Sequence, residues 1–158
     1  MKKLFFAVIV VLSLSACNSQ SEVPKIAIGS IEKETLLSTY KPFMKHFENV
    51  SLTSEQVAEV KAWPDSISID IYFGTWCPDS QREVPILLKA LADNSKVAFN
   101  LIALDMHKSD PKGLAKKAKI GFTATFVVLK NNQEIGRVVE RPKIDLITDL
   151  NQIIINNQ

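Results

Sequence analysis

Hydrophobic and polar positions change their spacing several times along the chain, and each spacing predicts one kind of element. A short apolar stretch at 26–31 is typical of an edge strand, and leucine and aromatic side chains then recur at helical spacing over 32–47. Thr53 followed three residues later by Gln56 is a capping-box pattern, which predicts the start of a second helix. Pro64 ends that helix.

The spacing then shortens to that of a strand. Isoleucines alternate with polar residues over 66–73, so we expect a strand that runs into Gly74, and helical spacing resumes over 79–93. The remaining segments predict a strand at 97–104, a helix at 111–119, a strand at 125–130, a turn at 131–132, a strand at 134–139 and a helix at 142–155. This order predicts an α/β fold with a mixed central sheet and helices on both faces.

The first 16 residues are typical of a removable secretory signal. Two lysines precede an apolar run from 4 to 14, and the small residues Ser15 and Ala16 come directly before Cys17. The apolar run is shorter than the ~20 residues that a membrane-spanning helix needs. We therefore expect residues 1–16 to be a signal peptide that is cleaved off.

The sequence Leu-Ser-Ala-Cys at 14–17 resembles the lipobox of bacterial lipoproteins. The resemblance implies that Cys17 carries a lipid and becomes the new amino terminus, facing the periplasm from the cell envelope, and Asn18 after it favours the outer membrane. An ordinary thiol near a signal-peptidase site is the alternative for Cys17. Residues 17–24 are then a short polar, lipidated tether, and 25–158 form a single domain.

Removing the leader changes the charge balance. The 19 basic residues become 17, which equals the 17 acidic residues, so the formal net charge falls from +2 to zero. Phosphate binding requires a basic patch, and we assign the lysines between 108 and 119 to a solvated helix face, so no nucleic-acid partner is expected. His46 and His107 lack partners at ligand spacing, so we expect no metal and no other cofactor.

Cys77 is the residue most suited to chemistry. With Cys17 lipidated it is the only free thiol of the mature chain, and it lies where the strand at 66–73 ends and the next helix begins. The unpaired N–H groups and the dipole of a helix amino terminus stabilise a thiolate relative to a thiol. Trp76 and Pro78 flank it with rigid apolar surface suited to an extended peptide. The alternative is a buried, inert cysteine.

These residues resemble the thioredoxin family, whose motif is Trp-Cys-x-x-Cys at a strand-to-helix junction with a proline eight residues after the first cysteine. Trp76, Cys77 and Pro85 match that motif, and the strand at 125–130 with Asn131 is similar to the family's strand and turn after the active-site loop. The resemblance covers the chain from Ile67 onward and implies a thioredoxin-like fold. Trp-Cys-Pro-Asp-Ser resembles a bacterial branch in which the second cysteine is often absent.

Three positions depart from the redox-active pattern. Ser80 stands where the resolving cysteine belongs, so no internal thiol releases a mixed disulfide at Cys77. Ala124, before Thr125, replaces the family's cis proline, and because a non-proline cis bond costs about 2.5 to 4 kcal/mol we expect Thr123–Ala124 to be trans. Ile71 takes the place of the buried carboxylate.

The missing carboxylate leaves the proton acceptor open. Asp70 lies one position before Ile71, so its side chain points to the other face of the strand. Asp79 and Glu83 share one helical face and are candidates to replace the acceptor, although ordinary surface charge also explains them.

The leading hypothesis is a monomeric lipoprotein whose Cys77 exchanges thiols or disulfides with envelope proteins, with Ser80 hydrogen-bonding the thiolate and an external thiol donor resolving the adduct. Trp76, Pro78, Ala124 and Thr125 are the expected docking residues. The alternative is a redox-inactive binding module on the same fold. A peroxidase, suggested by the threonine two residues before Cys77, is a third and weaker hypothesis.

Overall fold

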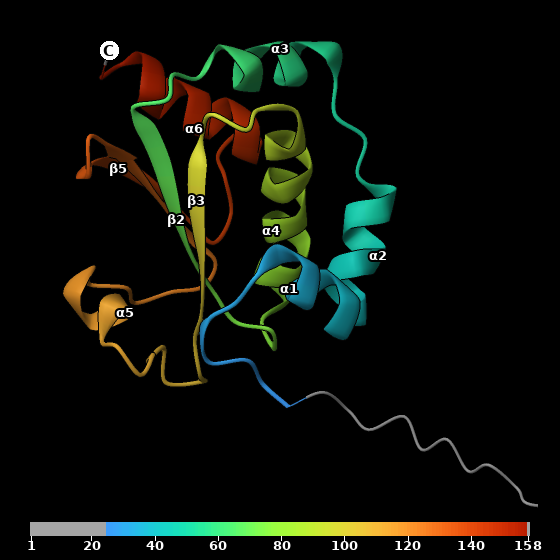
Figure 1. Ribbon diagram of the computed structural model, residues 1–158, viewed down its shortest axis with the longest axis vertical. Coiled ribbons are helices and arrows are strands. Elements are labelled where there is room, and N and C mark those ends of the chain that lie inside the picture. The colour runs from blue at the N-terminus through green and yellow to red at the C-terminus, as the bar shows by residue number, and fades with distance from the viewer. Residues whose placement is uncertain (1–24, 158) are drawn as a thin grey trace, which may run out of the picture.

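A single mixed sheet of five strands organises the molecule (Figure 1). The computed structural model describes residues 25–157, so the expected signal peptide, the tether and Cys17 lie outside the described residues. The sheet has the order β1-β3-β2-β4-β5; β2 and β3 are parallel and every other neighbouring pair is antiparallel. The strands are β1 (Gly29–Ser30), β2 (Ile67–Phe73), β3 (Ala98–Ala103), β4 (Thr125–Lys130) and β5 (Gln133–Val139). The mixed sheet and the α/β class are confirmed.

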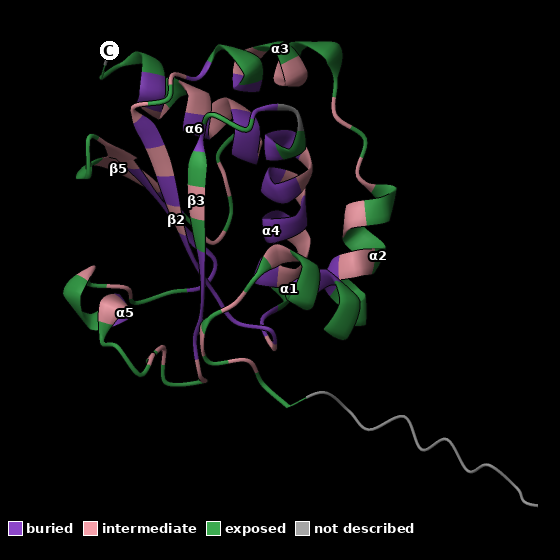
Figure 2. Ribbon diagram, viewed as in Figure 1, coloured by how far each residue is buried: buried purple, intermediate pink, exposed green. Residues whose placement is uncertain are grey.

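The two faces of the sheet are covered unequally. The isoleucines of β2 at 67, 69 and 71 share one large core with the helices on their side. Figure 2 shows much of β2 and of the neighbouring α4 in the colour of buried residues. The opposite face packs Tyr72, Ile102 and Val127 on the four-residue helix α5. The helices are α1 (Lys33–Thr39), α2 (Lys41–Asn49), α3 (Ser54–Ala62), α4 (Pro78–Ala90), α5 (Leu114–Lys117) and α6 (Leu146–Ile155), with a 3-10 turn at Leu91–Asp93.

Local sequence signals place several of these elements correctly. Thr53 Oγ1 accepts from the Gln56 N–H at 3.2 Å, and the Gln56 side chain accepts from the Thr53 N–H at 2.9 Å, which confirms the capping box at the start of α3. The expected helix at 32–47 is instead two helices that meet at Tyr40, since Pro42 lies in the first turn of α2.

The helices expected at 111–119 and 142–155 are shorter than their patterns suggest. Gly113 has φ 68°, outside the helical region, and Asp110 accepts from the backbone of Ala115 at 2.8 Å, so the chain turns before α5 begins. Asp145 is the N-cap of α6 and accepts from the Thr148 N–H at 3.0 Å, which moves the start of that helix to Leu146. Within residues 25–157, every helix falls short of the length and apolar character that membrane crossing requires.

Candidate active site

Cys77 is the N-cap residue of α4, directly after the turn that leaves β2. Its backbone N–H donates to the Gly74 carbonyl at 3.0 Å, and its own carbonyl accepts from the Gln81 N–H at 3.0 Å, the first bond of the helix. Pro78 occupies the first helical position, where a missing N–H costs nothing. The side chain of Cys77 is 7% exposed, and it is the free cysteine of the described residues.

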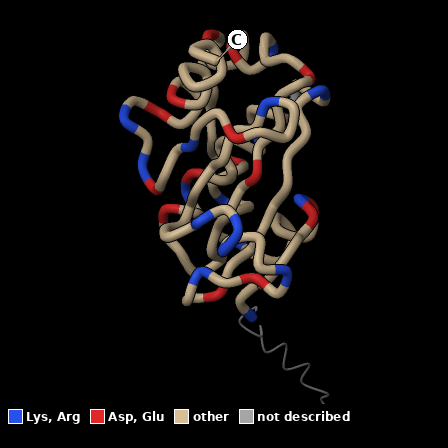
Figure 3. The backbone as a smooth tube through the Cα atoms, turned by 90° about the vertical axis from the view of Figure 1, so that its left-hand side faces the viewer, with Lys and Arg blue, Asp and Glu red and all other residues tan. Residues whose placement is uncertain are grey.

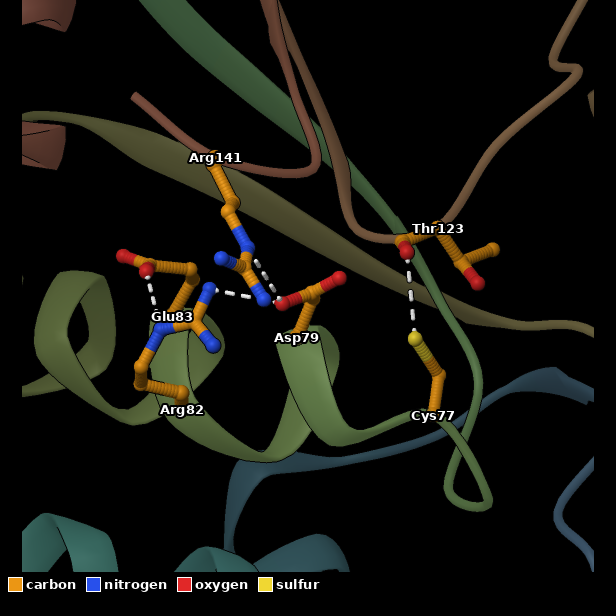
Figure 4. A network of polar contacts seen from close by, with 6 residues as sticks. All are labelled: Cys77, Asp79, Arg82, Glu83, Thr123 and Arg141. Atoms are coloured by element: carbon orange, nitrogen blue, oxygen red, sulfur yellow. Dashed lines mark hydrogen bonds and ion pairs between the residues drawn. The ribbon is translucent and has the colours of Figure 1, made fainter. Parts of the chain in front are cut away.

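The thiol of Cys77 faces the loop before β4. Its Sγ donates a hydrogen bond to the Thr123 carbonyl at 3.1 Å, as Figure 4 shows. The Thr123–Ala124 peptide bond is cis, so the expectation of a trans bond was wrong. That expectation weighed only the preference of an isolated peptide bond, whereas here Ala124 is fully buried and its carbonyl accepts from the Glu140 N–H at 2.7 Å. Tertiary contacts on both sides of the bond outweigh the local preference.

The hydroxyl of Ser80 bonds the turn that precedes α4. Its side chain is completely buried, and its Oγ accepts from the Gly74 N–H at 3.1 Å. The hydroxyl therefore satisfies a backbone donor of the turn between β2 and α4, and the described hydrogen bond of the Cys77 thiol goes to Thr123. A serine hydroxyl that accepts one hydrogen bond can still donate another, so the hydrogen bond expected from Ser80 to a Cys77 thiolate stays a prediction.

Trp76 lies over the same turn. Its Nε1 donates to the Leu104 carbonyl at the end of β3, 3.1 Å away, and its indole packs so closely on Gly74 that a Cβ there would lie 2.7 Å from a ring carbon. The ammonium of Lys108 is 5.7 Å from the ring centroid. Thr75, which lies between Gly74 and Trp76 in the sequence, accepts a hydrogen bond from the Ala27 N–H at 3.3 Å through its Oγ1. Three separate segments thus hold the turn that presents Cys77.

The first turns of α4 carry a chain of charges that runs away from the sulfur (Figure 4). Arg82 bonds Asp79 at 2.8 Å and Glu83 at 2.6 Å, and Arg141 from the loop after β5 reaches the same Asp79 oxygen at 3.4 Å. Partial burial raises the pKa of Asp79, but the hydrogen bonds and charges of Arg82 and Arg141 outweigh it, so the net pKa is lowered. Asp79 is therefore ionised at neutral pH, and its carboxylate is paired with Arg82 and Arg141.

The carboxylates considered as proton acceptors for Cys77 all have other partners or point elsewhere. Glu83 is 5% exposed and bonds Arg82, and neither it nor Asp79 has a described bond to Cys77. Ile71 is fully buried, and Asp70 accepts from Asn100 at 2.7 Å on the other face of the sheet, as its strand position predicts. The proton of the thiol is thus held by a backbone carbonyl rather than by a carboxylate.

The residues expected to dock a client differ in their exposure to solvent. Pro78 is exposed, whereas Thr125 is buried and donates to the Phe122 carbonyl at 2.8 Å. Two exposed apolar residues near the site were not expected from the sequence: Phe122, 58% exposed and next to Thr123, and Met106, 60% exposed and two residues after Leu104, which bonds Trp76. Phe122 could have been predicted as a site residue, because it is a large apolar residue close to Ala124, which replaces the family's cis proline.

The described part of the chain contains no group of three His, Cys, Asp or Glu side chains able to hold a metal ion. His107 is exposed in the loop after β3, where its N–H donates to Asp105 at 2.8 Å, and His46 is exposed on α2.

Comparison with known families agrees with this geometry. A family model described as Thioredoxin matches residues 32–149, which is most of the chain. The chain belongs to the thioredoxin family. Relatives of this family member include chloroplastic thioredoxin Y1 of Arabidopsis thaliana, 26% identical over 79% of the chain and 71% of that protein. A thioredoxin of Echinococcus granulosus is 32% identical over 48% of the chain and 66% of that protein.

Solved structures similar to this thioredoxin-family chain support the same fold. A protein of unknown function from Pseudomonas aeruginosa superposes with a TM-score of 0.67, at 15% identity, over 82% of the chain and 94% of that protein. An HIV epitope scaffold superposes with a TM-score of 0.57, at 18% identity, over 78% of the chain and 84% of the scaffold. Thioredoxins act by thiol–disulfide exchange, so family membership points to partners that bear thiols or disulfides.

Proposed function

We propose that this thioredoxin-family protein is a monothiol exchange protein of the bacterial cell envelope. The Cys77 thiolate attacks one sulfur of a client disulfide, forms the mixed disulfide and expels the other client sulfur as a thiolate, which takes up a proton. One external thiol then attacks the Cys77 sulfur and releases the client thiol, and a second attacks the resulting adduct, regenerates Cys77 and leaves as a disulfide. A client sulfenic acid reacts in the same way, with water as the group that leaves.

The observation that carries this proposal is that a serine hydroxyl stands at position 80, where a resolving thiol would lie. Cys77 is the free cysteine of residues 25–157, and Ser80, one helical turn after it, carries a buried hydroxyl bonded to Gly74. An alcohol does not displace a thiolate from a disulfide, so resolution requires a thiol from outside the chain. Cys77 itself is the N-cap residue of α4 and follows directly on the turn that leaves β2.

Anchoring is part of the proposal and is supported by the leader sequence. Cys17 follows an apolar run and two small residues, and a lipid on it would fix the domain to the periplasmic face of a membrane, with the outer membrane favoured by Asn18. Metabolic labelling with palmitate tests this point: the label is expected on the wild-type chain and absent from Cys17→Ala.

Intact-mass measurement tests the chemistry. The chain from residue 17 onward, with Cys17→Ser so that Cys77 is the single thiol, is incubated with a small aromatic disulfide and then with excess glutathione. We expect one stoichiometric adduct that persists until glutathione is added. Cys77→Ser is the matched control and must stay unmodified. No adduct on folded protein would contradict the proposal.

A redox-inactive binding module remains the second candidate, and two observations favour it. The Cys77 thiol is 7% exposed and bonded to Thr123, while Phe122 and Met106 expose large apolar side chains near it. In that case clients would bind Cys77→Ser as tightly as wild type and would lose affinity with Phe122→Ser. Under the leading proposal, Cys77→Ser abolishes the covalent adduct.

A further inference from the structure

The chain joins its folded domain beside Cys77. The Ala27 N–H donates to Thr75 Oγ1 at 3.3 Å, two residues before the cysteine, and Lys25 is held by the hydroxyl of Tyr40, which donates to its carbonyl at 2.7 Å. Figure 1 shows the first described residues and the loop between β2 and α4 at the same end of the molecule. The amino-terminal attachment and the reactive sulfur therefore share one pole of the domain.

The carboxyl terminus lies at the opposite pole (Figure 1). The carbonyl of Asn157 accepts from Lys130 Nζ at 2.7 Å, and Lys130 pairs with Ile67 at the beginning of β2. Cys77 follows the other end of that seven-residue strand. At about 3.3 Å per residue, the two poles are separated by roughly 20 Å along β2 alone.

The segment between Cys17 and the domain is short. Seven residues, 18–24, separate the two, which makes eight steps along the chain from Cys17 to Lys25, and at no more than ~3.6 Å per step Lys25 stays within about 29 Å of Cys17. A flexible chain of this length spans roughly 15 Å on average. A lipid on Cys17 would thus limit how far the pole that bears Cys77 moves from a membrane.

That pole exposes an apolar rim, which we define as Ile26, Ile28, Met106 and Phe122. Their exposed fractions are 42%, 52%, 60% and 58%, and each belongs to a segment that contacts the Cys77 turn or its sulfur. Such side chains suit the apolar residues that flank a disulfide in a protein client.

We propose that the anchor turns Cys77 toward the membrane, so that its clients are membrane-bound proteins with a disulfide or sulfenic acid near the lipid surface, which dock on the apolar rim. This inference rests on the lipidation of Cys17 in the proposed function. It adds a restriction on the client: sulfurs far from the membrane lie outside the reach of Cys77, whatever their reactivity.

Two anchoring positions on the same domain provide the test. The chain from residue 17 onward, with Cys17→Ser, carries a hexahistidine tag either before residue 17 or after Gln158, and each form is bound to vesicles of phosphatidylcholine with a nickel-chelating lipid. The vesicles also contain a lipid whose headgroup bears a pyridyl disulfide. Release of pyridinethione reports the attack of Cys77, and a dissolved pyridyl disulfide measures intrinsic reactivity.

We expect the amino-terminally anchored form to react with the headgroup disulfide about tenfold faster or more, because anchoring near the target raises its effective concentration. Both forms should react equally with the dissolved disulfide. Inserting about 30 Gly and Ser residues after Pro24 should remove most of the advantage. Equal rates of the two anchored forms with the headgroup disulfide would overturn the inference. It would also be overturned if the vesicle-bound protein stopped reacting with the dissolved disulfide, because the apolar rim would then dock on lipid and close the site.

The tag replaces the lipid, so this result is independent of acylation. If palmitate labelling shows no lipid on Cys17, the anchoring part of the proposed function fails while the geometry measured on vesicles still stands. If the label is present and the two anchors react equally, only the inference on the client fails. Cys77→Ser sets the background in every arm.

Discussion

The thiol of Cys77 donates its hydrogen bond to the carbonyl of Thr123, 46 residues further along the chain. This contact joins the amino terminus of α4 to the loop before β4, and the neighbouring Ala124 is bonded in turn to Glu140 at the end of β5. The reactive sulfur therefore belongs to a junction of three segments. Under the proposed exchange, the thiol gives up this hydrogen bond when it loses its proton and forms a mixed disulfide.

Gly74→Ala should displace Trp76. A Cβ at this position would lie 2.7 Å from the indole, so the ring must move away and give up its bond to Leu104. Overpacking of this kind costs about 1 to 3 kcal/mol. Denaturant unfolding and a red shift of tryptophan emission would report the change. Gly121→Ala is the matched control, since a Cβ there meets nothing within 4 Å; equal effects of the two variants would contradict the packing described.

Ser80→Ala should destabilise the fold while leaving Cys77 in place. The variant orphans the buried Gly74 N–H, at a cost of about 1 to 3 kcal/mol in the free energy of unfolding. Urea titration measures the loss. Ser38→Ala removes an exposed serine hydroxyl that bonds a helix carbonyl, and should change stability by less than about 0.5 kcal/mol. A neutral Ser80→Ala would show that the hydroxyl has another role.

The charge of Asp145 should stabilise the protein above, but not below, its titration range. Burial raises the pKa of Asp145, but the hydrogen bonds from Thr148 and Gln56 outweigh this and lower the net pKa below its ordinary value of 3.8. Because the folded pKa is depressed, its contribution is complete above about pH 4 and is lost as the pH falls through the folded pKa. Asp145→Asn should flatten the acid limb of a plot of unfolding free energy against pH, and an acid limb as steep as that of the wild type would contradict the role given to Asp145.

Tyr72 should produce the opposite dependence at high pH. Burial, with the charges of Asp70 and Asp110, raises the pKa of its phenol from 10.0 to about 12. A raised folded pKa means that the contribution is complete below about pH 10 and is lost as the pH rises toward 12. Tyr72→Phe should therefore reduce the fall in the free energy of unfolding across this range. An unchanged slope would place the phenol in contact with solvent.

The elements nearest the reactive cysteine were predictable because their signals are local. Alternating isoleucines predict β2, helical spacing from Asp79 onward predicts α4, and together they place Cys77 at a helix amino terminus. The capping box at Thr53 is equally local. Each signal lies within a few residues of the structure that it specifies.

The contacts of the site depend on residues far apart in sequence, and these escaped prediction. The partner of Cys77 is Thr123, in a cis bond held by burial and by Glu140, and Arg141 pairs with Asp79 across 62 residues. The bond that Ser80 accepts from the Gly74 N–H is visible only in the folded turn. Pattern and propensity carry no information about such pairings.

The lifetime of the mixed disulfide at Cys77 shows whether its release needs a thiol from outside the chain. Ser80→Cys places a thiol where the buried hydroxyl lies, and its adduct with a small aromatic disulfide is compared with that of Ser80 protein by intact mass over time, both in the Cys17→Ser background. We expect the adduct of the Ser80 protein to persist until an external thiol is added. In Ser80→Cys, the new thiol should displace the aromatic thiol and form an internal disulfide with Cys77. Spontaneous release from Ser80 protein without added thiol would contradict this requirement for an external thiol.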